Sequence, residues 1–160
     1  MAKIDHDPQG LSDEILETSE VTRQLREVVR LARIDDDLSW QIIDAVLPKL
    51  AQKTEFVNWA RMSTTHRTAS FRDLAGSIFE QTEIGLTDED IALLVELMNE
   101  VRSSNPYPCF RAACALAKRV RDNRVFRYRN DIVTTLNRYA FDDEVNEDAL
   151  RYLQLIEKGK

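Results

Sequence analysis

Apolar residues recur along most of the chain at the spacing of one helix face. The first such stripe follows Ser12 and consists of Val21, Leu25, Val28, Val29 and Ala32. These positions repeat every three or four residues, which is the period of an amphipathic helix. No segment shows the sustained alternation of apolar and polar residues that is typical of a strand. The pattern therefore predicts an all-α protein.

Polar residues, Gly and Pro divide the stripes into about seven helices. One of these is expected from Thr65 to Thr82. Residues 53–63 are compatible either with a short extra helix or with a loop that packs by its aromatic side chains. Pro48 lies inside a helical segment and predicts a kink or an early stop there. We expect a flexible leader over residues 1–10 and a single all-helical domain over residues 11–160.

From Ser39 onward the predicted helices pair into three antiparallel hairpins, at residues 39–82, 87–121 and 126–157. Phe71-Arg72 and Phe110-Arg111 begin the stripes of two second helices, 39 residues apart. Together with Leu47-Pro48 in a first helix, this spacing resembles HEAT-type helical repeats, whose period is about 40 residues. The resemblance covers about three quarters of the chain and implies a stack of helical hairpins. An irregular helical bundle is the alternative.

The overall charge limits the classes of partner. The 160 residues include 22 Lys and Arg against 28 Asp and Glu, a net charge of −6. Such a chain is repelled on average by nucleic acid and by anionic membranes, so binding of either requires a segregated basic face. No apolar run is long enough for a membrane span, and the N-terminal residues contain no apolar core of a secretory signal. We therefore expect a cytoplasmic protein that does not bind membranes.

Few residues are available for catalysis or for binding a metal. The chain has no Gly-rich phosphate loop, no His-Glu-x-x-His, no Cys-x-x-Cys and no Gly-x-Ser-x-Gly. His6 belongs to the predicted leader, and His66 lies at a predicted helix start. Cys109 and Cys114 are expected to be small side chains in a reducing compartment, with Cys114 buried on an apolar stripe. The acidic clusters fall at predicted helix starts, where carboxylates cap free amides. The sequence thus predicts a protein without enzymatic activity, metal or cofactor.

One segment departs from the overall acidity. The 28 residues from Arg111 to Arg138 contain eight basic and two acidic side chains, a net charge of +6. Helical spacing predicts that Arg111, Lys118 and Arg121 share one face, and further arginines continue through the following turn with aromatic residues between them. Arg side chains bind carboxylates and phosphates in a bidentate manner. The candidate binding residues are Arg111, Lys118, Arg121, Arg124, Arg127, Tyr128 and Arg129.

Three interpretations of this basic run remain open. Its arginines either pair with nearby acidic helix starts, including Asp142, Asp143 and Glu144, or they receive an acidic segment of a partner protein, or they contact nucleic acid. The negative net charge places nucleic acid third. We predict a non-enzymatic protein–protein interaction module that uses the Arg-rich face. The alternatives are a nucleic-acid-binding module that uses the same arginines on phosphates, and a small acidic inhibitor or immunity protein.

Overall fold

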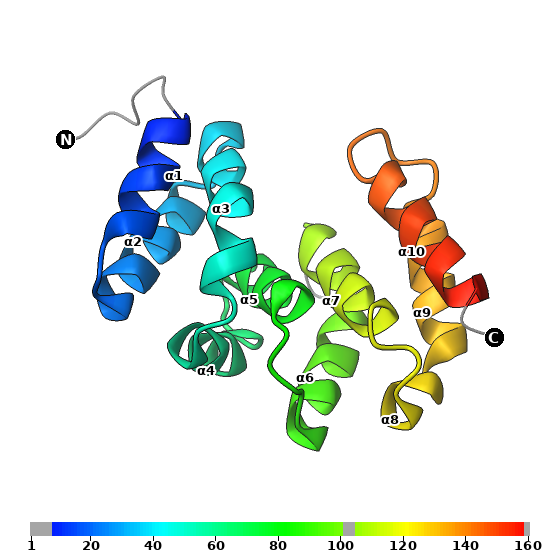
Figure 1. Ribbon diagram of the computed structural model, residues 1–160. Helices are drawn as coiled ribbons and strands as arrows, with labels where there is room; N and C mark the ends of the chain where they lie inside the picture. Colours follow the sequence, from blue (N-terminus) through cyan, green and yellow to red (C-terminus); the bar gives the residue numbers. More distant parts are fainter. Residues whose placement is uncertain (1–7, 101–104, 159–160) are drawn as a thin grey trace. The chain divides into compact units, whose positions relative to one another are not determined.

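A computed structural model of the chain describes residues 8–100 and 105–158 (Figure 1). Within these ranges the chain forms ten helices and no strand. The predicted all-α class is confirmed, whereas the number of helices exceeds the predicted seven. The chain divides into two compact units, residues 1–84 (unit 1) and residues 85–160 (unit 2). The single domain predicted over residues 11–160 stays a prediction.

Unit 1 contains the first five helices. They are α1 (Pro8–Glu17), α2 (Val21–Ile34), α3 (Asp37–Leu50), α4 (Thr54–Ser63) and α5 (Ala69–Gln81). α1 packs chiefly on α3, and α2 contacts α3, α4 and α5. The predicted stripes contribute to the core, with Val28, Ile43, Leu74 and Ile78 fully buried. Burial of each such side chain contributes roughly 1.5–3 kcal/mol relative to its exposure to water. In α2 the predicted Val21, Leu25 and Val29 are only half-buried.

Three boundaries in unit 1 differ from those predicted. The single helix expected after Ser12 is divided into α1 and α2 by a break at residues 18–20. There the Thr18 hydroxyl donates to the Glu14 carbonyl at 3.0 Å and satisfies a carbonyl at the end of α1. Residues 54–63 form α4, and α5 begins at Ala69 rather than near Thr65. α1 begins at Pro8, inside the predicted leader, and residues 1–7 lie outside the described residues.

The acidic residues between α2 and α3 act as caps, as predicted. Asp35 ends α2 in the left-handed conformation, with a φ of 56°. The Asp36 carboxylate accepts a hydrogen bond of 2.7 Å from the Ser39 amide at the start of α3. Hydrogen bonds from Ser39 lower the pKa of Asp36. α3 continues for two residues past Pro48, and the Ala51 amide still donates to Leu47 at 2.8 Å.

Unit 2 is organised around one buried helix. Its elements are α6 (Asp88–Met98), α7 (Tyr107–Ala117), α8 (Asn123–Phe126), α9 (Arg129–Arg138) and α10 (Asn146–Lys158). α7 packs against α6, α9 and α10, and α9 also packs against α10. All residues from Pro108 to Ala117 except Arg111 are buried. Four alanines and Cys114 let the neighbouring helices approach this backbone closely.

A capping box begins α6, which agrees with the capping role expected for the acidic clusters at helix starts. The Thr87 hydroxyl accepts from the Asp90 amide at 3.1 Å, and the Asp90 carboxylate accepts from the Thr87 amide at 3.0 Å. We expect Thr87→Ala to lower the free energy of unfolding by about 1 kcal/mol, because the Asp90 amide loses its acceptor. Thr134→Ala is the control, since Thr134 is exposed within α9. Equal urea midpoints for the two variants would contradict the capping role.

Candidate binding surface

The sequence-predicted basic residues do not form one surface. α7 ends at Ala117, and residues 118–122 form a turn in which the Arg119 amide donates to Leu116 and the Val120 amide to Ala117. Each of these bonds joins residues three apart, as in a 3-10 turn, and not four apart as in an α-helix. The tighter turn directs the Val120 side chain into the core. Arg121 consequently lies beyond the helix, so the prediction that it shares a helix face with Arg111 and Lys118 is wrong.

Arg111 and its neighbours lie largely within the packing of unit 2. The Arg111 side chain is only 20% exposed, and its Nη1 lies 3.9 Å from Asp148 Oδ2 in the first turn of α10. Its guanidinium also lies 5.6 Å from the centre of the Phe110 ring. Arg119 donates to the Ala115 carbonyl at 2.9 Å, and Lys118 is half-buried. Arg111 therefore links α7 to α10 instead of facing solvent.

Exposed arginines of the basic run cluster in the segment 121–129, which we call the arginine turn, and Arg138 at the end of α9 is exposed as well. Arg121, Arg124 and Arg127 are exposed, and the Phe126 side chain between them is 53% exposed. Tyr128 and Arg129 are half-buried at the base of this segment. An exposed aromatic side chain and exposed arginines in one short segment are typical of the residues that dominate protein–protein interfaces.

Two local features hold the arginine turn in place. Val125 is fully buried and anchors α8 to the core of unit 2. Asp122 caps α8, because its carboxylate accepts a hydrogen bond of 2.9 Å from the Arg124 amide. The Val125 and Phe126 amides both donate to the Asp122 carbonyl at 2.9 Å. The short helix therefore presents Phe126 outward while Val125 points inward.

The three exposed arginines of the arginine turn differ in their electrostatic surroundings. Arg124 Nη2 lies 2.7 Å from Asp122 Oδ2, and its Nη1 lies 2.8 Å from Asp88 Oδ1 at the start of α6. The hydrogen bonds from Arg124 lower the pKa of Asp122, and both aspartates raise the pKa of Arg124. Arg127 lies 5.2 Å from the centre of the Tyr128 ring. Within the described residues, neither Arg121 nor Arg127 has a carboxylate partner.

The predicted pairing of arginines with acidic helix starts is confirmed in part. Arg124 pairs with Asp88 at the start of α6, and Arg111 lies near Asp148 in the first turn of α10. The acidic cluster at residues 142–144 acts differently. Asp142 accepts from the Glu144 and Val145 amides at 2.8 and 3.3 Å, so it organises the turn before α10. No ion pair within residues 105–158 joins this cluster to the arginine turn.

Both cysteines are free thiols in the core of unit 2. The burial predicted for Cys114 is confirmed, and Cys109 is also buried. The Cys109 Sγ donates to the Met98 carbonyl at 2.8 Å, and burial raises its pKa. Burial and the contact with Cys109 raise the pKa of Tyr139 to about 12. A thiol with a raised pKa is a poor nucleophile at neutral pH.

We expect both thiols to react slowly with a thiol reagent in the native protein, because both are buried and the core excludes the reagent. The raised pKa of Cys109 also makes its thiolate scarce. Labelling should become rapid and complete after unfolding in urea. Mass spectrometry of labelled peptides distinguishes Cys109 from Cys114. Rapid native labelling of Cys114 would contradict its placement on the buried face of α7.

His66 acts in the local structure of unit 1. Its Nδ1 accepts from the Thr68 amide at 3.0 Å, and its ring lies 4.8 Å from the Phe71 ring. Its carbonyl accepts from Arg72 Nη1 at 2.7 Å. His6 lies outside the described residues. Over the described ranges, no three His, Cys, Asp or Glu side chains gather in a way that could hold a metal ion.

Two surface features were missed by the sequence reasoning. Phe126 was placed in the basic run but not among the candidate binding residues, and its exposure follows from the burial of Val125 beside it. The second is a stripe of four exposed arginines on α2, which are Arg23, Arg26, Arg30 and Arg33. Their spacing of three or four residues is visible in the sequence.

Comparison of the chain with protein-family models, with curated proteins and with solved structures finds no significant match. No helix in the described part of the chain is both long enough and apolar enough to cross a membrane.

Proposed function

We propose that the protein is a non-enzymatic interaction module, and that its arginine turn binds an acidic segment of a partner protein. The observation that carries the proposal is that Phe126, Arg121, Arg124 and Arg127 are all exposed within one segment of nine residues, 121–129. Arg121 and Arg127 have no carboxylate partner among the described residues, so they are available to a partner's carboxylates. An apolar side chain of the partner would pack on Phe126 and exclude water from the charged contacts.

The architecture of unit 2 supports a binding role. α6 packs on α7, α9 packs on α10, and α7 also packs on both helices of the second pair. Hairpins packed in this order suit a HEAT-like stack, which we include in the proposal together with a cytoplasmic location. Such stacks use the surfaces of successive hairpins to bind other macromolecules. Because the arginine turn connects α7 to α9, a partner bound there would contact two successive helix pairs.

The experiment removes the three exposed guanidinium groups together. Arg121→Ser, Arg124→Ser and Arg127→Ser are combined in one variant, and binding is measured with a Glu-rich peptide that contains a single tryptophan. We expect affinity to fall by about thirtyfold or more, since one anchoring arginine is commonly worth about 2 kcal/mol. The fold should persist, because exposed ion pairs contribute only about 0–1 kcal/mol each.

A variant with the same change in charge serves as the control. Lys49→Ser, Arg67→Ser and Lys158→Ser remove three exposed cations outside the arginine turn. Equal loss of peptide binding in both triple variants would show that only net charge matters and would contradict the proposal. Preferential binding of duplex DNA would favour the nucleic-acid alternative. In that case a plot of the logarithm of the DNA-binding constant against the logarithm of the salt concentration should become less steep in the arginine variant, by about one unit per lost phosphate contact.

A further inference from the structure

One face of α2 carries a row of arginines that the proposed function does not use. The row, which we call the α2 stripe, consists of the exposed residues Arg23, Arg26, Arg30 and Arg33. At about 100° per residue these positions fall within an arc of about 80° and extend over roughly 15 Å of the helix. Val28 and Ala32, on the opposite face, are fully buried in the core of unit 1. With four arginines and one glutamate, α2 has a net charge of +3, whereas the whole chain has a net charge of −6.

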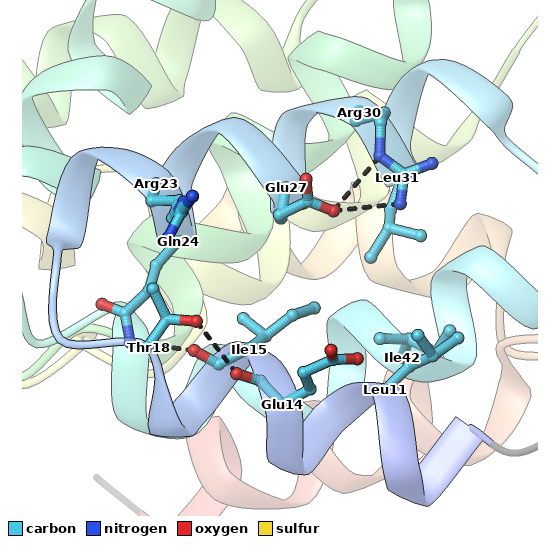
Figure 2. Close-up of a pocket in the computed structure, with 10 residues that line it drawn as sticks. All are labelled: Leu11, Glu14, Ile15, Thr18, Arg23, Gln24, Glu27, Arg30, Leu31 and Ile42. Atoms are coloured by element: carbon cyan, nitrogen blue, oxygen red, sulfur yellow. Dashed lines mark hydrogen bonds and ion pairs between the residues drawn. The ribbon is translucent and has the colours of Figure 1, made fainter. Parts of the chain in front are cut away.

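Acidic side chains neutralise little of the α2 stripe. Arg30 pairs with Glu27, and its Nη2 lies 3.0 Å from Glu27 Oε2 (Figure 2). Arg23, Arg26 and Arg33 have no ion-pair partner among the described residues. Neighbouring members of the stripe are three or four residues apart, a spacing at which like charges on a helix repel each other. A polyanion bound along the stripe would relieve this repulsion.

The two flanks of the α2 stripe have different surroundings. Arg23 and Arg30 line an open groove between α1 and α2, with a volume of about 770 Å³ (Figure 2). The same groove is lined by Glu14 of α1 and by Glu27, so carboxylates weaken the positive charge on this flank. Arg26 and Arg33 lie on the other flank of the helix, which is the more strongly positive one.

Aromatic side chains lie beside this second flank, at the C-terminal end of the α2 stripe. The Arg33 guanidinium lies 5.6 Å from the centre of the Phe71 ring of α5. Trp59 of α4 meets the same ring edge-on with centroids 5.9 Å apart, and the His66 ring lies 4.8 Å from it. Phe71 is buried, whereas Trp59 and His66 are only half-buried. Arg33, Trp59 and His66 therefore gather around one buried ring.

The nitrogen donors of these two half-buried rings are available to a ligand. The Trp59 indole N–H has no acceptor within the part of the chain that the structure describes. The His66 Nδ1 accepts from the Thr68 amide at 3.0 Å, so in the neutral ring Nε2 carries the proton. A row of guanidinium groups beside an accessible aromatic ring is the combination by which proteins bind single-stranded nucleic acid.

We infer that this face of unit 1 binds single-stranded nucleic acid. The phosphates lie along the α2 stripe, whose arginines bind them in a bidentate manner. A base next to Arg33 stacks on Trp59, which the bases of a duplex, already stacked on one another, cannot do. The excess of negative charge over the rest of the chain confines the strand to this basic face. The site belongs to unit 1 and does not depend on the function proposed for the arginine turn.

The first test follows the fluorescence of Trp59. The chain contains only two tryptophans, so Trp40→Phe leaves Trp59 as the single indole. This full-length variant is titrated at about 50 mM salt with single strands of about 12 thymidines or about 12 uridines. We expect saturable quenching by at least one of the two strands, because a base stacks on the indole, and little quenching by a DNA duplex of the same length.

The second test removes the two arginines on the aromatic flank. Arg26→Ser/Arg33→Ser should weaken binding of the single strand about tenfold or more at about 50 mM salt. A plot of the logarithm of the binding constant against the logarithm of the salt concentration should become less steep by about 1.4 units, at about 0.7 units per phosphate contact. Lys49→Ser/Lys158→Ser makes the same change in charge at exposed positions elsewhere and should leave the affinity within about twofold.

Circular dichroism verifies that all variants keep their helical content. The inference is overturned if neither strand binds saturably, if binding leaves the Trp59 fluorescence unchanged, or if the lysine variant loses as much affinity as the arginine variant. A loss of strand binding only in the Arg121→Ser/Arg124→Ser/Arg127→Ser variant would also overturn it, because the nucleic acid would then lie on the arginine turn. Displacement of the strand from the α2 stripe by a lower concentration of the Glu-rich peptide would assign the stripe to an acidic protein instead.

Discussion

Replacing Phe110 with alanine is expected to lower the free energy of unfolding by about 3–5 kcal/mol. Phe110 is fully buried in α7, and its ring meets the Tyr139 ring edge-on with centroids 5.0 Å apart. Truncation would remove that contact and leave a cavity beside α9. It would also remove the ring against which the Arg111 guanidinium lies. Small domains are stable by only about 5–15 kcal/mol, so this loss is a large fraction of the total.

Phe126→Ala provides the matched control for this substitution. The same atoms are removed from a side chain that is 53% exposed, so stability should change by about 0.5 kcal/mol or less. Urea unfolding followed by circular dichroism measures both variants. Equal effects of the two substitutions would contradict the placement of Phe110 in the core and of Phe126 on the surface.

The second large effect is expected from added bulk on α7. Ala113→Leu should destabilise the protein by about 1–3 kcal/mol, because Ala113 is fully buried in a helix that three other helices contact. The added atoms would force α6, α9 or α10 away from the α7 backbone. Thr134→Leu adds bulk on the exposed side of α9 and should change stability by about 0.5 kcal/mol or less.

Thermal and urea unfolding of both leucine variants measure this difference. A stable Ala113→Leu protein with an unchanged midpoint would show that α7 is not tightly packed. The small side chains of α7 would then require another explanation.

Much of the fold could be predicted from the sequence because burial follows the helical period. The apolar residues that recur at helical spacing in unit 2 supply much of its core, which includes Ile91, Leu94, Phe110, Ile132 and Leu136. The boundaries between helices could be predicted only where the chain carries a recognisable capping residue. Thr87 and Asp36 are recognisable caps, and both act as caps in the structure.

Helix ends that carry no Gly, Pro or clear capping residue could not be predicted from the sequence. Residues 18–20 contain neither Gly nor Pro, and Thr18, just past α1, donates to the Glu14 carbonyl near the end of that helix. α7 also ends without a breaking residue, where Val120 turns into the core. Packing of this kind between elements is not encoded in local propensity.

The sequence predicts a segment rich in arginine, but it does not predict which of these arginines lie together on the surface. The excess of arginine between residues 111 and 138 is evident from the sequence. Tertiary packing then separates its members, since Arg111 approaches Asp148 of α10 while Arg121 and Arg127 stay exposed without a carboxylate partner. The contact between Arg124 and Asp88 joins positions 36 residues apart, which helical periodicity cannot predict.

We propose the arginine turn as the surface that binds an acidic partner. The most direct test is a titration of the isotope-labelled chain with the Glu-rich peptide, followed by amide chemical shifts in NMR spectra. We expect saturable shifts concentrated at residues 121–129, and their loss in the Arg121→Ser/Arg124→Ser/Arg127→Ser variant. Shifts that do not saturate, or that concentrate outside residues 121–129 and persist in that variant, would contradict it.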